Sequence, residues 1–189
     1  MNPVIDAIRS RRTVKLMRTD VKPSRVQIET IIEAGTWAPN HHLTEPWRFV
    51  VITDEGRAKL GEALVRALEN SPAENPTAER TEKERNKPLS APVIVALIGR
   101  PKSGGNVVHQ EEIVAAGAAL QNMLLAAHSL GLASMVKTGA LSYSAEVRDF
   151  LRMDETELLI GMIYLGFASG PPPPGRRTDF HGMVTWLQS

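Results

Sequence analysis

Apolar side chains recur with helical spacing in several parts of the chain, and this pattern predicts its helices. A first helix runs from Val4 to near Arg12. A second opens at Ser24, because Ser24 and Gln27 have the spacing of a capping box, and it stops within residues 35–39. Further helices are expected over residues 56–68, 111–130 and 144–151.

Unbroken apolar runs predict buried strands between these helices. Residues 47–52 are rich in β-branched and aromatic side chains, which favour a strand. Residues 92–98 are apolar throughout, as is typical of a strand that is covered on both faces. Shorter runs at 133–136 and 158–165 complete the set, so helices and strands interleave along the chain.

Two segments depart from these simple patterns. Residues 69–88 are polar, charged and interrupted by Pro72 and Pro76, which predicts the most mobile part of the chain. The helix over 111–130 is instead apolar around nearly its whole circumference. A chain of this size cannot enclose such a helix by itself, so we expect a second subunit to cover part of it.

The C-terminal segment has the pattern of an arm. Prolines at 171–174 force an extended path that cannot fold back as a helix. Beyond them the chain carries apolar side chains such as Trp186 and Leu187, which need a surface to cover them. We therefore expect residues 170–189 to leave the domain and to pack on a neighbouring subunit.

Composition narrows the class of protein. The chain has 189 residues, of which 42% are apolar and 23% charged, which is typical of one globular domain. Its formal net charge of +1 argues against binding to nucleic acid or to an anionic membrane. The absence of cysteine excludes disulfides, thiolate nucleophiles and iron–sulfur clusters, so redox chemistry would need a bound cofactor. With no signal peptide and no membrane-spanning run, a cytoplasmic location is expected.

A basic cluster near the N-terminus is the first candidate binding site. The segment Arg11-Arg12-Thr13-Val14-Lys15 places three cations around a hydroxyl group, with no acidic residue beside them. Arginine forks and a hydroxyl donor match the charge and acceptor oxygens of a phosphate monoester. A solvated basic helix end is the alternative for this segment taken alone, because cations complement the negative end of a helix dipole.

Two further polar segments carry cations that would bind the same anion. Lys137 and Thr138 follow the strand predicted at 133–136, and ligands favour the carboxyl ends of strands. Arg176 or Arg177 supplies another cation beyond the prolines. Each set taken alone is an ordinary surface feature, but their convergence on one anion would explain why cations recur in distant parts of a nearly neutral chain.

The loop after the second helix carries His41 and His42. Adjacent histidines rarely direct both rings at one metal ion, and no further ligand falls at a usual spacing, so we predict no metal site. The imidazoles either contact a ligand or form an exposed polar loop. Trp37 either lies near a ring system or packs in the core. The chain also lacks the motifs of P-loop hydrolases, zincins and serine hydrolases.

The order of these features resembles the FMN-dependent nitroreductase family, in particular its compact YdjA-like subgroup, nearly from end to end. The resemblance implies an α+β fold in which helices flank a mixed central sheet. It also implies a single FMN-binding domain over residues 1–189 and an intertwined homodimer with FMN at the subunit interface. The matching segments are Arg11-Arg12-Thr13, the residues 38–42, the run 46–51, the alanine-rich helix, and residues 157–161 leading to 165–166.

The resemblance also implies a function. The protein would use NAD(P)H to reduce FMN and then a small aromatic acceptor, such as a nitroaromatic or a quinone, in a ping-pong reaction. FMN carries the redox chemistry, so no protein residue is assigned as catalytic acid, base or nucleophile. A non-enzymatic FMN carrier or sensor, and a phosphate-binding module without flavin, are the alternatives. The residues expected to contact FMN are Arg11, Arg12, Thr13, Trp37, His41, Val136, Lys137, Thr138 and Arg176, with Trp37 or His41 reaching it from the partner subunit.

The chain departs from the family pattern at two positions of the histidine loop. Glu45 stands before the Pro-Trp pair where many relatives have Gln, and Leu43 stands where many have Asn. A carboxylate at this point bears on the choice of substrate more than on flavin binding. The proline run also leaves the register of the arm open, so Arg176 is preferred over Arg177 by a narrow margin.

Overall fold

Strand β5 (Leu158–Ala168) is the centre of the sheet in this computed structural model, which describes residues 2–72, 76–102, 104 and 106–188. β3 (Val93–Gly99) and β4 (Ala133–Lys137) both pair with it. β1 (Met17–Arg18) pairs with its last residues, and β2 (Trp47–Thr53) completes the sheet beyond β3. β5 is therefore the strand with which most of the other strands of the sheet pair.

All of the strand pairs in the described chain are antiparallel. One isolated parallel bridge joins Thr13 to Ser134, so the sheet is mixed only through this contact. A register shift in the pairing of β3 with β5 falls between Leu97 and Ile98, where β5 carries one extra residue. The bridge at Thr13 ties the basic N-terminal segment to the first half of β4.

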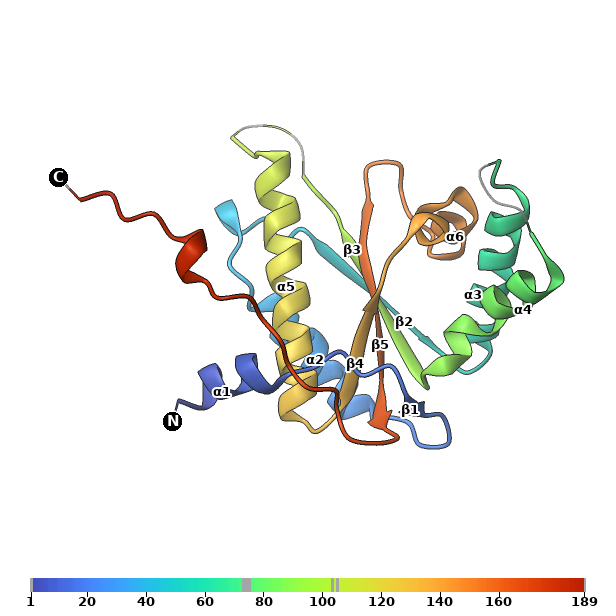
Figure 1. Cartoon of the computed structure of the whole chain (residues 1–189). Helices are drawn as coiled ribbons and strands as arrows, with labels where there is room; N and C mark the ends of the chain where they lie inside the picture. Colours follow the sequence, from blue (N-terminus) through green and yellow to red (C-terminus); the bar gives the residue numbers. More distant parts are fainter. Residues whose placement is uncertain (1, 73–75, 103, 105, 189) are drawn as a thin grey trace.

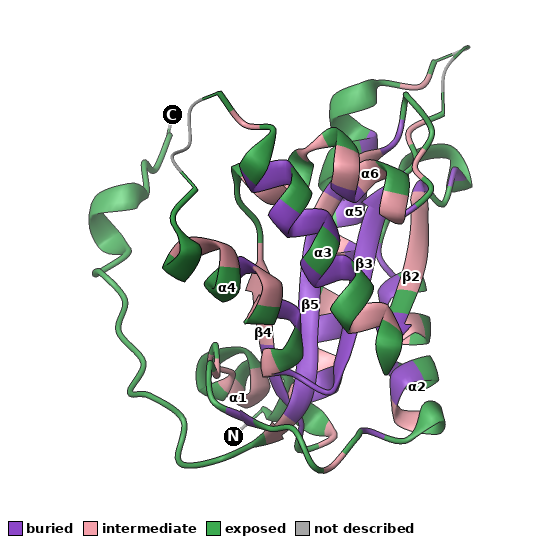
Figure 2. Ribbon diagram, turned by 90° about the vertical axis from the view of Figure 1, so that its right-hand side faces the viewer, coloured by how far each residue is buried: buried purple, intermediate pink, exposed green. Residues whose placement is uncertain are grey.

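Helices cover both faces of the sheet (Figures 1 and 2). α2 (Arg25–Thr36) and α5 (His109–Ser129) pack on one face. α3 (Glu55–Glu69) and α6 (Ala145–Phe150) pack on the other. Successive side chains of β3 point to opposite faces, so Val93, Val95 and Leu97 meet α2 and α5 while Ile94, Ala96 and Ile98 meet α3 and α6.

Two further helices and four short 3₁₀ turns complete the fold of the described residues. α1 (Pro3–Ser10) lies beside α5, and α4 (Ala78–Asn86) packs against α3. The short turns are η1 (His41–Leu43), η2 (Lys87–Ser90), η3 (Ala140–Tyr143) and η4 (His181–Met183). The predicted α+β class, with helices flanking one central sheet, is confirmed.

Helix α4 lies within the stretch that the sequence marked as polar and mobile. Thr77 caps it by accepting a hydrogen bond from the backbone N–H of Arg80 at 3.2 Å. Its Glu84 is buried and forms an ion pair with Lys87. At Gly61 of α3 a Cβ atom would overlap the carbonyl oxygen of Arg85, so glycine is what allows the two helices to meet. Residues 73–75 of the same stretch lie outside the described residues.

Two apolar surfaces stay uncovered in the single chain. Val114 on α5 is 64% exposed, and Gly117 one turn later has open space beside it. Every described residue from Ala168 onward is exposed, and Figure 2 shows the last part of the arm, around η4, lying away from the helices and the sheet. No helix in the described part of the chain combines the length and hydropathy that a membrane span needs.

Candidate functional site

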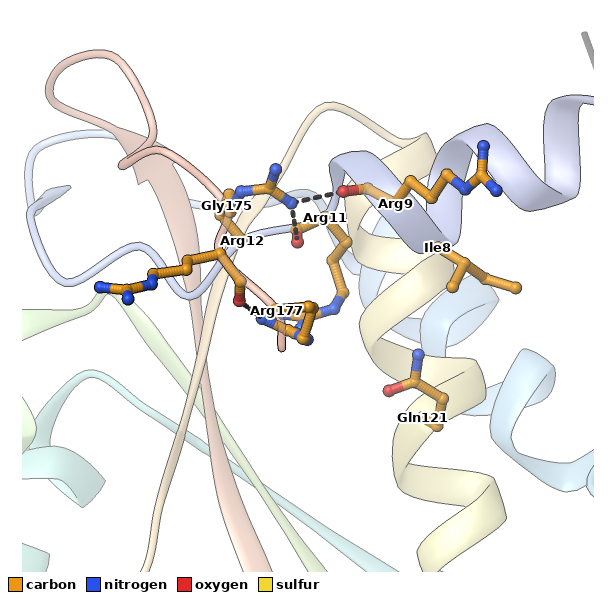
Figure 3. A pocket seen from close by; sticks show the side chains of 8 residues that line it. Ile8, Arg9, Arg11, Arg12, Gln121, Gly175 and Arg177 are labelled. Atoms are coloured by element: carbon orange, nitrogen blue, oxygen red, sulfur yellow. Dashed lines mark hydrogen bonds between the residues drawn. The ribbon is translucent and has the colours of Figure 1, made fainter. Parts of the chain in front are cut away.

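A cavity of about 400 Å³ lies where the end of α1, the middle of α5 and the C-terminal arm meet. Figure 3 shows that its walls carry several guanidinium groups. No acidic side chain lines it, so its positive charge is unbalanced by the protein. The lining residues are Ile8, Arg9, Arg11, Arg12, Gln121, Gly175, Arg176 and Arg177.

Helix α1 sets the position of the arginine pair. Asn2 caps the helix by accepting hydrogen bonds from the N–H groups of Val4 and Ile5 at 2.9 and 3.4 Å. The helix ends at Ser10, and Arg11 turns to an extended conformation with φ −56° and ψ 133°. The chain then runs along β4, where Val14 donates its N–H to the carbonyl of Ser134 at 3.1 Å.

A contact between α1 and α5 holds this arrangement. The hydroxyl of Ser10 lies 2.8 Å from Nε2 of His128, near the C-terminal end of α5. Ser10 also donates to the carbonyl of Asp6 at 2.6 Å, so its side chain is fixed from both sides. The arginine pair is therefore anchored at α5 on one side and at β4 on the other.

The guanidinium groups of the cavity differ in how they are satisfied. Nη1 of Arg12 donates to the carbonyls of Arg9 and Arg11 at 2.5 and 2.9 Å, and Nη1 of Arg177 donates to the carbonyl of Arg176 at 2.7 Å (Figure 3). Nε of Arg11 is buried and has no hydrogen-bond partner in the described part of the chain. A buried donor without a partner is costly, and an anion in the cavity would supply the missing acceptor.

Close approach of the arm to Arg12 depends on a glycine. A Cβ atom at Gly175 would overlap the guanidinium group of Arg12. Glycine at residue 175 therefore lets the arm lie directly against the guanidinium group of Arg12, which would otherwise have to shift. The cavity brings Arg11, Arg12 and Arg176 together, and Arg177 lines it as well. The other members of the predicted convergence, Thr13, Lys137 and Thr138, do not line it, so the prediction that all of these residues meet at one cavity is wrong for the single chain.

Lys137, at the end of β4, does not line this cavity. Its Nζ donates to the hydroxyl of Ser90 at 3.3 Å and lies 4.2 Å from the centre of the Tyr164 ring. The pKa of Lys137 is lowered to about 8, mainly by burial and also by the positive charge of Lys87, while Glu84 opposes the shift. The ammonium group is thus directed towards η2, on the face of the sheet that α3 covers.

The neighbours of Lys137 lie on different sides of β4. Val136 packs against the core between the sheet and the helices α2 and α5. Thr138 is exposed and follows the strand. Because Thr13 bridges Ser134 on this strand, β4 connects the basic N-terminal segment to the turn that starts at Thr138.

Trp37 and His41 lie outside the arginine cavity. Trp37 caps the end of α2 and is 80% exposed, so the alternative that it packs in the core is wrong for the single chain. Nδ1 of His41 lies 2.6 Å from a carboxylate oxygen of Glu111, and its ring stacks on His42 at 4.0 Å. Within the described residues, no group of three or more His, Asp or Glu side chains is placed to hold a metal ion.

A buried hydrogen bond fixes the loop that carries these histidines. Oγ1 of Thr44 donates to the carboxylate of Glu112 at 2.6 Å, and both side chains are buried. The same carboxylate accepts the N–H of Lys102 at 3.2 Å. Glu45, which departs from the family pattern, is exposed and adopts φ 48°. The loop is therefore anchored at the start of α5 while Trp37 and His41 stay open to solvent.

Sequence reasoning missed three parts of the arginine cavity. Arg9 lies two residues before the basic cluster, within the helix predicted from Val4 to near Arg12. Gln121 is a polar position in an otherwise apolar helix, which is a usable signal for a surface that meets a ligand. Gly175 became informative only when the structure placed Arg12 against it.

Comparisons with known proteins agree with this fold. Residues 8–167 match the model that describes the nitroreductase family. YdjA of Escherichia coli K12, provisionally named an NAD(P)H nitroreductase, is 31% identical over 144 residues, which cover 76% of this chain and 77% of YdjA. YfhC of Bacillus subtilis 168, named in the same way, is 26% identical over 181 residues, which cover 95% and 92%. The chain therefore belongs to the nitroreductase family.

Solved structures show the same fold. A nitroreductase-like protein from Bacillus cereus superposes with a TM-score of 0.85 at 22% identity, covering 100% of this chain and 98% of that one. A protein from Desulfovibrio desulfuricans, provisionally named a nitroreductase and solved in complex with FMN, has a TM-score of 0.76 at 27% identity, covering 100% and 98%.

Proposed function

We propose that this protein is an FMN-dependent NAD(P)H oxidoreductase whose arginine cavity binds the phosphate of FMN. The observation that carries the proposal is the buried, unpartnered Nε of Arg11 in a cavity that no acidic side chain lines. A phosphate monoester supplies the negative charge and the acceptor oxygens that this cavity lacks. Membership in the nitroreductase family and the FMN complex of the relative from D. desulfuricans support the same cofactor.

Different residues would contact the phosphate and the ring system of the cofactor. Arg11, Arg12 and Arg176 would hold the phosphate, and the hydroxyl of Thr13 would add a donor beside them. From Ser134, which Thr13 bridges, to Thr138 the chain extends about 13 Å at the rise of a strand. That span brings Val136, Lys137 and Thr138 alongside the ring system.

When bound, FMN would supply the two-electron chemistry, namely hydride transfer from NAD(P)H and reduction of a nitroaromatic or quinone acceptor in a ping-pong sequence. The protein binds and orients the cofactor and leaves one ring face open to both substrates in turn. A cation near the ring, as Lys137 provides, stabilises negative charge on it.

A homodimer would complete the site. Trp37 and His41 are exposed in the single chain and lie outside the cavity, and one of them would reach the flavin from a partner subunit. The uncovered side of α5 around Val114 and Gly117 offers a contact surface for that partner. The exposed arm, residues 170–189, would pack on the partner, and residues 1–189 would form one FMN-binding domain.

The absorption spectrum of the purified protein tests the proposal. We expect yellow protein with a flavin spectrum that NAD(P)H bleaches under anaerobic conditions and that a nitroaromatic or quinone restores. Initial rates should give parallel double-reciprocal plots, as a ping-pong reaction requires. Colourless protein that cannot be reconstituted with FMN contradicts the proposal, whereas bound FMN without any turnover identifies a carrier or sensor instead.

A further inference from the structure

A second cavity, of about 540 Å³, lies at the end of the sheet where α5, β5 and α6 come together. In Figure 1 the first turns of α5, the start of β5 and α6 are all at the upper end of the molecule. Its volume is in the range of cavities that bind small organic molecules, about 300 to 1,000 Å³. Its lining residues are Ile113, Tyr143, Arg148, Leu158, Leu159 and Ile160.

The lining is apolar apart from two groups. The side chain of Tyr143 is 49% exposed, and its hydroxyl has no hydrogen-bond partner among the described residues. Arg148 is the charged residue of the lining. Its guanidinium group is held in place because Nη2 donates to the carbonyl of Asp154 at 2.6 Å and Nη1 to the carbonyl of Glu157 at 2.9 Å. The cavity thus combines apolar walls with one fixed positive charge.

Three carboxylates that neighbour lining residues along the chain are already engaged. Glu111 is paired with His41, and Glu112 accepts hydrogen bonds from Thr44 and Lys102. The carboxylate of Glu157 accepts two hydrogen bonds from Arg48. These three carboxylates therefore do not compete with a negatively charged group in the cavity for Arg148.

The cavity shares a wall with the turn that follows β4. Ile160 lines the cavity, and Gly161 is the next residue along β5. A Cβ atom at Gly161 would lie 2.9 Å from Cγ1 of Val136 and 3.7 Å from Cγ2 of Thr138, so this point of β5 is close to both residues. Tyr143 belongs to η3, which starts two residues after Thr138. A molecule in the cavity would consequently lie next to the residues assigned to the flavin ring.

We propose that this cavity is the acceptor subsite and that it selects planar aromatic acceptors carrying an anionic substituent, such as an aromatic carboxylate. The aromatic ring lies between Ile113 and Ile160, and the anionic group faces Arg148. The hydroxyl of Tyr143 donates a hydrogen bond to an oxygen of the acceptor. This inference rests on the proposed oxidoreductase function, because it assigns the second substrate of that reaction.

A matched pair of acceptors tests the charge preference. With the FMN-loaded protein, 4-nitrobenzoate should show a KM about three- to tenfold lower than the neutral 4-nitrobenzamide, which has nearly the same shape. The difference should shrink as salt screens Arg148. Equal KM values for the two compounds overturn the proposal.

Variants that fill the cavity test its location. Ile113→Trp and Tyr143→Trp, from opposite walls, should each raise the KM for 4-nitrobenzoate by about tenfold. Val51→Trp on β2, with 44% exposure against 39% for Ile113, is the matched control outside the cavity and should leave KM unchanged. Ferricyanide needs no organic acceptor site, so the rate of its reduction by each of the three variants should stay within about twofold of the rate of the unsubstituted protein. An unchanged KM in both cavity variants, or an equal loss with ferricyanide, overturns the proposal.

Direct binding separates this inference from the proposed function. Saturation-transfer NMR reports contact of 4-nitrobenzoate with the protein and needs no turnover. We expect a signal with the unsubstituted protein and with Val51→Trp, and its loss in Ile113→Trp and Tyr143→Trp. If NAD(P)H fails to bleach the flavin, the proposed function fails, while the NMR result still decides whether the cavity binds the aromatic anion.

Discussion

Arg48 forms two hydrogen bonds with Glu157: Nε and Nη2 of the guanidinium donate to the two carboxylate oxygens at 2.9 and 2.6 Å. The Glu157 side chain is 2% exposed, and it also accepts the backbone N–H of Asp154 at 3.0 Å. Nη2 of Arg48 further donates to the carbonyl of Arg152 at 3.1 Å. The pair therefore fastens β2 to the loop that leads into β5.

Breaking this pair should destabilise the protein. We expect Glu157→Gln to lower the free energy of unfolding by about 3 kcal/mol, because it leaves a partly buried guanidinium without its counter-charge. Urea denaturation at pH 7 measures the loss. Arg25→Ala, at an exposed ion pair with Glu29 on α2, is the control and should leave the unfolding midpoint in place.

The same pair predicts how stability responds to acid. Hydrogen bonds from Arg48 hold the pKa of Glu157 below its usual range, against the opposing effect of burial. A carboxylate with a lowered folded-state pKa contributes stability that is complete above its unfolded pKa, about 4.3, and is lost as the pH falls through the folded value. Unfolding curves of Glu157→Gln should therefore depend less on pH between about 5 and 3 than those of the unsubstituted protein. Parallel pH profiles for the two proteins would contradict this account.

The buried charge of Lys137 should lower stability, whereas the charge of Glu157 raises it. The folded pKa of Lys137, about 8, lies below the ordinary 10.5, so the folded protein binds fewer protons than the unfolded chain between these values. Stability should rise with pH across that window, and below about pH 8 the cost of burying the ammonium group is fully present. Lys137→Met should stabilise the protein at pH 7 and abolish the rise, as urea titrations at pH 7 and 9.5 would show. Lys59→Met, on the exposed side of α3, is the control, and a less stable Lys137→Met protein at pH 7 would refute the argument.

Arg11 should carry a large share of FMN affinity. Replacing it with Ala removes charge-assisted hydrogen bonds and should weaken FMN binding by about 1.5 to 3 kcal/mol, or roughly 10- to 150-fold. Arg11→Lys keeps the charge but loses the fork, so its affinity should fall between the two. Titration of flavin fluorescence gives the dissociation constants. Unchanged FMN retention in Arg11→Ala would remove Arg11 from the site.

A substitution at Gly117 tests the proposed homodimer. It lies on the uncovered side of α5 with no atom near its missing Cβ, so the single chain tolerates a long side chain there. Gly117→Arg should shift the protein from dimer to monomer in light scattering coupled to size exclusion, and FMN should be lost with the partner's residues. Ala58→Arg, an exposed position of α3 on the opposite face of the sheet, should remain dimeric. A dimeric Gly117→Arg protein would place the interface elsewhere.

Local chemistry made much of the fold predictable. Ser24 and Gln27 form the expected capping box, with the Ser24 hydroxyl accepting at 3.2 Å and the Gln27 side chain accepting at 2.9 Å. Ser144, at the start of the helix expected over residues 144–151, caps α6 by accepting the N–H of Val147 at 3.3 Å. Such signals are found in the sequence because both partners lie within one turn.

Elements held by distant contacts were harder to see. β1 spans two residues and exists only because Met17 and Arg18 pair with the end of β5. α4 has no apolar face, and its position depends on the close approach of Gly61 to Arg85. The sequence likewise grouped Lys137 with the arginines as a cation, but the pleat of β4 and the position of Ser90 decide where its ammonium group points. These facts depend on pairs that are far apart in the sequence.

The central place of β5 bears on how the chain folds during synthesis. β2 and β3 can pair as soon as both have left the ribosome, but β1, β4 and the other edge of β3 each need β5, which ends at residue 168. Because long-range pairings form slowly, the nascent chain must wait with an open, apolar edge on β3 until most of it has been translated. Chaperones that shield exposed strand edges should consequently matter more for the yield of this protein than for one built from local helical contacts.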